Sequence, residues 1–190
     1  MSETRGPDAL EAHLMAFARG EGHAARRIIA ALAPRLLAFA TRMLNDRGEA
    51  EDVVQETMLR LWRAAPDWRP GEAMVSTWAF RVASNLAIDR MRRRGRQETG
   101  ADTEAMIDDT PGAVERMAEA ERRAALDAAL ARLPDRQRQA VILRHLEGLA
   151  NPEIAAIMEI TVEAVESLTA RGKRELRALL LPMKEDLSHD

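Results

Sequence analysis

Apolar residues recur every three or four positions along most of this chain, which is the period of an amphipathic helix. The clearest example places Ile28, Leu32 and Leu36 on one side of a long run. Runs of this kind occupy residues 8–18, 21–44, 48–65, 76–94, 122–133, 134–147, 151–158 and 162–181. No stretch of useful length alternates with the two-residue period of a strand. The pattern therefore predicts an all-α protein.

Breaks in the pattern divide the chain. Pro66 and the pair Pro70-Gly71 predict a loop over residues 66–76, with Ser76 as the cap of the next helix. Pro34 predicts a kink or the start of a second helix. Residues 95–111 have little periodicity and many acidic side chains. We therefore expect two small helical domains, over residues 8–95 and 113–182, joined by an acidic flexible linker over residues 96–112.

Turn residues locate the later helices. Gly148 is expected to end one helix in the left-handed conformation, and Pro182 to follow the end of the last. Asn151 and Thr161 are expected to cap the two helices between them.

Composition narrows the class of protein. The 190 residues carry a net charge of −3 and no cysteine, which excludes disulfides and thiolate metal sites. The four histidines are scattered without metal-ligand spacing, so we expect no metal and no cofactor. Because no apolar run approaches the roughly 20 residues of a membrane span, we expect a cytoplasmic protein without membrane insertion. All aromatic residues precede position 81, so a C-terminal core must be aliphatic.

Charge is distributed unevenly despite the small net value. Residues 81–96 contain six arginines and one aspartate, whereas residues 98–121 contain eight acidic residues and one arginine. Two solvated faces would account for this pattern, and so would a helix end that contacts nucleic-acid phosphates.

Residues 147–176 carry the strongest local pattern, a short helix, a tight turn and a longer helix. Such a unit can place its second helix in the major groove of DNA, with exposed Arg or Lys reaching bases and phosphates. A plain helical hairpin is the alternative. Glu163, at the start of the second helix, suits the positive end of the helix dipole. The candidate DNA-contacting residues are Ser167, Arg171, Lys173 and Arg174.

Two earlier helices carry further candidates. Asp52, Gln55 and Glu56 share one helical face, which is either a solvated surface or a docking surface for a basic partner. No nucleophile or base accompanies these carboxylates, so we expect no catalytic site. In the next helix, Trp78 and Phe80 are more typical of a core than of base stacking. The candidate nucleic-acid contacts there are Asn85, which could bond an exposed base edge, and Arg90, Arg92, Arg93 and Arg94, which suit the backbone.

Taken in order, four stretches resemble one family. They are AEDVVQETMLRLW (50–62), TWAFRVASNLAIDRMRRR (77–94), LPDRQRQAVILRHLEGLANPEIAAIM (133–158) and VEAVESLTARGKREL (162–176). Over about residues 8–182 the chain resembles an extracytoplasmic-function sigma factor, the small two-domain class of the sigma-70 family. The last helix departs from many members, which have Lys, Arg and His at the positions of Glu166, Leu168 and Ala170.

The resemblance implies a role for each stretch. The first (Asp52, Gln55, Glu56) would dock on the largest subunit of core RNA polymerase. The second (Asn85, Asp89, Arg90, Arg92, Arg93) would read and melt the −10 promoter element, with loop 66–76 holding a flipped base. The last (Ser167, Arg171, Lys173, Arg174) would read the −35 element. The implied partners are core RNA polymerase, through its largest and second-largest subunits, promoter DNA and an anti-sigma factor.

Two other functions fit parts of the sequence. A conventional helix-turn-helix regulator would explain residues 133–176 but gives no role to residues 50–62 and 77–94. A helical interaction protein or small enzyme would use none of the candidate contacts. The resemblance favours a non-enzymatic sigma factor.

Overall fold

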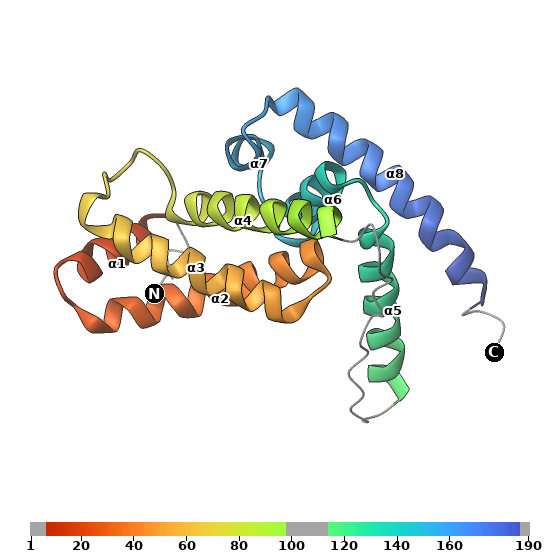
Figure 1. The fold of residues 1–190 in the computed structure, drawn as a ribbon, viewed down its shortest axis with the longest axis horizontal. Coiled ribbons are helices and arrows are strands. Elements are labelled where there is room, and N and C mark those ends of the chain that lie inside the picture. The colour runs from red at the N-terminus through yellow and green to blue at the C-terminus, as the bar shows by residue number, and fades with distance from the viewer. Residues whose placement is uncertain (1–6, 98–113, 187–190) are drawn as a thin grey trace, which may run out of the picture.

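The computed structural model describes residues 7–97 and 114–186, which form helices and no strand (Figure 1). The expected all-α fold is confirmed over these residues. Most of the expected linker, from residue 98 to residue 112, lies outside them. None of the described helices combines the length and apolar character that a membrane crossing requires.

The N-terminal described range forms a bundle of antiparallel helices. Its elements are α1 (Pro7–Ala18), α2 (Gly22–Leu44), α3 (Arg47–Ala64), the 3-10 turn η1 (Ala65–Asp67) and α4 (Val75–Gln97). Between α2 and α3, Asn45 adopts a left-handed conformation with φ of 51° and the Asp46 carboxylate accepts a hydrogen bond of 2.9 Å from the Glu49 amide. These two residues end one helix and start the next, which turns the chain sharply.

Two expectations for this range need correction. Pro34 does not begin a second helix, because it lies inside α2, which continues through it to Leu44; a kink at Pro34 stays a prediction. Proline removes one backbone donor but does not by itself end a helix that is held on both sides by packing, and Leu32 and Leu36 are both fully buried. Ser76 does not cap α4, because the helix already begins at Val75.

The C-terminal described range contains the helix-turn-helix. Its elements are α5 (Val114–Ala131), α6 (Asp135–Val141), the π-helical turn η2 (Ile142–Leu146), α7 (Asn151–Met158) and α8 (Val162–Asp186). The left-handed Gly148 is confirmed, with φ of 71°. Thr161 caps α8 as expected, since its hydroxyl accepts a hydrogen bond of 3.2 Å from the Ala164 amide.

The boundaries of α7 and α8 differ in detail from the expectations. Ala150, not Asn151, is the residue before α7, and its amide donates to the Glu153 carboxylate at 2.8 Å. That carboxylate satisfies a backbone donor that the helix leaves unpaired. At the other end, α8 runs through Pro182 to Asp186.

The core is aromatic in the first range and aliphatic in the second. Phe39 and Phe80 meet edge to face with ring centroids 5.7 Å apart. In the second range the largest fully buried side chains are those of Leu130, Ile142, Leu143 and Ile154. The buried residues of both ranges nevertheless belong to one continuous cluster, so the two groups of helices are packed against each other.

Polar contacts strengthen the packing between the two groups. The Arg138 guanidinium on α6 donates to the Met43 carbonyl near the end of α2 at 2.8 Å. Arg35 on α2 donates to the Glu147 carboxylate at 3.2 Å and to its carbonyl at 3.1 Å. Burial raises the pKa of Glu147, and the charge of Arg35 opposes that rise. Figure 1 shows the result, with α7 lying against α4.

Candidate nucleic-acid interface

A groove of about 520 Å³ separates α3 from α4. It brings together the three α3 residues that the sequence singled out and two arginines of α4. The groove is lined by Asp52, Gln55, Glu56, Leu59, Arg60, Leu86, Arg90 and Arg93. The acidic face of α3 is therefore part of a concave surface of mixed charge with two leucines in it.

Neighbouring arginines favour the ionised form of Glu56 in this groove. The Arg60 guanidinium donates to the Glu56 carboxylate at 2.8 Å, one helical turn away. This hydrogen bond is the main reason that the pKa of Glu56 is lowered, and the charges of Arg60, Arg63 and Arg90 act in the same direction. Leu59 is 41% exposed beside these charges, which gives the groove an apolar contact point within a polar rim.

The candidate residues of α4 do not share one face. Whereas Arg90 and Arg93 line the groove against α3, Asn85, Asp89 and Arg92 line a second groove of about 480 Å³. The residues Asn85, Asp89 and Arg92 follow one another at spacings of four and three, so they form a continuous helical stripe. We call this stripe, together with Trp78 and Arg81 on the same side of the helix, the α4 face.

The second groove lies between the two groups of helices. Opposite the α4 face it is lined by residues of α6 and α7 and the turn after α7, namely Asp135, Arg136, Gln139, Ile157, Met158 and Glu159. Asn85 and Asp89 remain exposed side chains, but they open onto this groove. A DNA strand lying along the α4 face would need the space that α6 and α7 border here.

On α8, three of the four candidates lie together. Ser167, Arg171 and Arg174 are exposed and follow one another at spacings of four and three. The Arg171 guanidinium donates to the Ser167 carbonyl at 3.3 Å, which lays its side chain along the helix. These three residues form the α8 face, which neither α6 nor α7 covers.

Glu163, at the start of α8, has a local role. Its pKa is lowered by hydrogen bonds from its own backbone amide and from the Thr161 hydroxyl. The expected placement at the positive end of the helix is confirmed. A carboxylate engaged in this way stabilises the first turn of α8.

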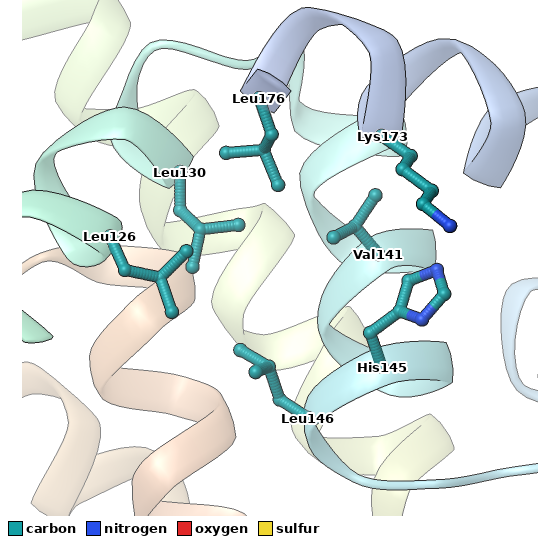
Figure 2. A pocket seen from close by; sticks show the side chains of 7 residues that line it. All are labelled: Leu126, Leu130, Val141, His145, Leu146, Lys173 and Leu176. Atoms are coloured by element: carbon teal, nitrogen blue, oxygen red, sulfur yellow. The ribbon is translucent and has the colours of Figure 1, made fainter. Parts of the chain in front are cut away.

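Lys173 lies away from the α8 face. It is six residues after Ser167, which rotates it by about 120° around the helix. Figure 2 shows it beside His145 at the edge of an apolar groove of about 160 Å³. Leu126 and Leu130 of α5, Val141 of α6, Leu146 of η2 and Leu176 of α8 complete the lining. Burial, with the charges of Lys173 and Arg144, lowers the pKa of His145.

Comparison with known proteins identifies both groups of helices. The family model described as Sigma-70 region 2 matches residues 28–97, and the model described as Sigma-70, region 4 matches residues 123–176. The ECF RNA polymerase sigma factor EcfG of Rhodopseudomonas palustris is 34% identical over 154 residues, which cover 80% of this chain and 82% of that protein. The chain belongs to the extracytoplasmic-function sigma factors of the sigma-70 family.

Other relatives agree with this assignment. The ECF RNA polymerase sigma factor SigE of Mycolicibacterium smegmatis is 34% identical over 151 residues, which cover 78% of this chain but only 58% of that relative's length. Among solved structures, the sigma factor RpoE of Bartonella quintana, in complex with the anti-sigma factor NepR, matches with a TM-score of 0.66 and 26% identity. That match covers 82% of this chain and 95% of that chain.

In this sigma factor, three residues with structural roles were not recognised in the sequence. Arg138 is only 9% exposed, whereas an arginine is ordinarily exposed. Arg94, grouped with the nucleic-acid contacts by its charge, instead donates to the Leu44 carbonyl at 3.0 Å and pairs with Asp46 and Glu49. Gly172 lies where α8 touches α6. Only Gly172 leaves a local signal, because glycine is unfavourable inside a helix unless packing requires it.

Proposed function

We propose that this sigma factor binds core RNA polymerase, directs it to promoters and helps to open the duplex, without an enzymatic activity of its own. The observation that supports this most directly is that two separate polar helix faces, on α4 and on α8, occur in one chain beside a third concave surface at α3. A single duplex-binding regulator needs only the α8 face. Two weak DNA readers on one chain gain affinity through their effective concentration.

Each surface receives one part of this function. The α3–α4 groove, with Asp52, Gln55 and Glu56, docks on the largest polymerase subunit, and its position suggests that Arg90 and Arg93 border that contact. The α4 face, with Asn85, Asp89 and Arg92, reads the −10 element. The α8 face reads the −35 element, with Ser167, Arg171 and Arg174 in contact with DNA and Lys173 at the edge of the contact.

We further propose that the protein acts in the cytoplasm and is controlled by an anti-sigma factor. The similarity to a sigma factor solved with an anti-sigma factor supports this control. The packing of the two groups of helices against each other is compatible with control by an anti-sigma factor. A partner that stabilises this packing keeps α6 and α7 opposite the α4 face.

Reconstitution with core polymerase tests the main proposal. We expect the purified chain to co-elute with core RNA polymerase on a sizing column and to direct transcription from a cognate promoter. Failure to co-elute would refute the proposal. Tight and specific binding to duplex DNA without polymerase would instead support a conventional helix-turn-helix regulator.

Replacing Asp52 by Ala should weaken core binding about tenfold, which corresponds to about 1.4 kcal/mol. Asp52 is exposed and lines the α3–α4 groove, so its loss should leave folding stability within about 0.5 kcal/mol of the wild type. Binding is measured by fluorescence anisotropy of labelled sigma factor. Glu51→Ala is the matched control, because Glu51 is equally acidic but pairs with Arg47 away from the groove. Equal affinities of the two variants would contradict the docking assignment.

Replacing Arg171 by Ala should remove the upstream part of the promoter footprint of the holoenzyme, because Arg171 is on the exposed α8 face. One lost base contact of this kind costs about 1–3 kcal/mol of specificity. Lys173→Ala removes the same charge from the same helix but on the side of the apolar groove. Because Lys173 is only at the edge of the proposed contact, we expect this variant to lose less of the upstream footprint than Arg171→Ala. If the two variants lose the upstream footprint equally, the division of α8 into two faces is wrong.

A further inference from the structure

The loop between η1 and α4, residues 68–74, is held by a side chain from a distant part of the chain. The Glu11 carboxylate on α1 accepts a hydrogen bond of 2.9 Å from the Gly71 amide and one of 3.3 Å from the Trp68 indole. Both bonds reach the same oxygen, Oε1. Most of the loop is exposed, and Gly71 has a φ of 82°. Glu11 thus fixes a turn whose own backbone forms no regular structure.

This loop continues the α4 face. The Trp68 ring meets the Trp78 ring edge to face, with centroids 6.1 Å apart. Trp78 is seven residues before Asn85 and fourteen before Arg92, so the three lie within about 40° of one another around the helix. The α4 face therefore extends for about 21 Å from Arg92 to Trp78 and meets the loop at its N-terminal end.

The docking of α1 does not depend on Glu11. Leu14 is fully buried, and the Phe17 ring packs on the Trp62 ring with centroids 4.5 Å apart. Glu11 is only half-buried and its described hydrogen bonds go to the loop. In addition, α1 precedes residues 28–97, which match region 2. Glu11 therefore holds the loop from outside the matched segment.

We propose that Glu11 is a positioning residue for promoter opening, which holds loop 68–74 in place so that a DNA strand lying along the α4 face meets an ordered surface. This inference rests on the proposed function of the α4 face. A loop that is ordered in advance loses less conformational entropy when the strand binds. Glu11 itself contacts no DNA; it acts through Trp68 and the backbone of Gly71.

Two substitutions separate the effect of the Glu11 hydrogen bonds from the effect of the packing of α1. Glu11→Gln keeps a side-chain oxygen that can accept both hydrogen bonds, whereas Glu11→Ala removes the acceptor. In the free full-length protein we expect faster hydrogen exchange over residues 68–74 in Glu11→Ala, and wild-type exchange in Glu11→Gln. Glu21→Ala, which removes an exposed carboxylate paired with Arg19, is the control and should not change that exchange.

The decisive measurement compares opening with polymerase binding. With core polymerase and a promoter that carries 2-aminopurine in its −10 element, Glu11→Ala should form open complex about tenfold more slowly at unchanged core affinity. Glu11→Gln should restore the rate to near the wild-type value. Opening at the wild-type rate by Glu11→Ala would overturn the inference, and so would an equal loss of core affinity in both variants, which indicates a general folding defect.

Failure of the proposed function would be seen differently. In that case the wild-type protein itself would open no promoter, and Asn85→Ala would not differ from it. If Asn85→Ala impairs opening while Glu11→Ala does not, the α4 face retains its role and only the positioning role of Glu11 is refuted.

Discussion

Replacing Arg138 by Met is expected to lower the free energy of unfolding by about 2–4 kcal/mol. The guanidinium donates to three backbone carbonyls, those of Met43 at 2.8 Å, Ala131 at 2.6 Å and Leu133 at 3.3 Å. Met fills much of the same space but donates nothing, so these carbonyls lose their donor in a buried site. A buried acceptor without a partner costs about 1–3 kcal/mol.

The position of Arg138 also predicts which group of helices loses more stability. Ala131 and Leu133 belong to its own group of helices, whereas Met43 belongs to the other. Every tryptophan precedes residue 81, so tryptophan fluorescence follows only the N-terminal group, and circular dichroism follows all helices. We expect the urea midpoint by circular dichroism to fall by about 1–2 M, and to fall below the midpoint by fluorescence.

The control for this prediction is Arg136→Met. Arg136 lies two residues earlier on the same helix and is exposed, so its replacement should change stability by no more than about 0.5 kcal/mol. If Arg138→Met unfolds at the wild-type midpoint by both methods, water replaces the guanidinium without loss, and Arg138 does not hold α6 to α2.

Arg138 also shows what the sequence could not predict. Periodicity correctly located the helices, because one side of each must face the core. It gave no warning of a buried arginine, because an arginine at such a position is ordinarily exposed. Its partners are backbone carbonyls up to 95 residues away. Carbonyl groups occur in every residue, so no residue type marks them in a sequence.

The candidate contacts were predicted as groups and divided by the structure. The sequence and the resemblance placed Asn85, Asp89 and Arg92 in one group with Arg90 and Arg93, yet these two sets line different grooves. The division follows from helix geometry, since residues one position apart differ in direction by about 100°. What the sequence could not supply is the position of α3, α6 and α7 around α4, which decides the environment of each side.

Helix ends were predicted well where the chemistry is strongly local. Thr161 and Gly148 have the expected roles because a hydroxyl and a glycine act within three residues of themselves. Asn151 is the first residue of α7 and Ser76 is the second residue of α4, so neither precedes its helix as expected. Both differences are within the one or two residues by which helix boundaries commonly vary.

Gly172→Ala is expected to destabilise the helix-turn-helix by about 1–3 kcal/mol, although alanine usually stabilises a helix relative to glycine. A Cβ at this position would lie 2.6 Å from Val141 Cγ2 and 3.3 Å from the Gln137 carbonyl oxygen. Val141 is β-branched, so its side chain has little freedom to turn away. The helices α6 and α8 must then separate, which shifts the α8 face relative to the rest of the protein.

Two further variants make this prediction specific. Gly95→Ala makes the same change in α4, where a Cβ would meet nothing within 4 Å, and should stabilise the protein by about 0.5–1 kcal/mol. Val141→Ala removes the methyl group that clashes, so its cost should be smaller in the Gly172→Ala background than in the wild type. Urea denaturation followed by circular dichroism measures the stabilities of the wild type, the three single variants and the double variant. If the stability cost of the double variant equals the sum of the two single costs, the contact between α8 and Val141 does not limit how closely α6 and α8 pack.

If this contact is limiting, the Gly172→Ala holoenzyme should also lose its upstream footprint while core binding through α3 persists. The displaced α8 face then no longer reaches the −35 element in register with α4.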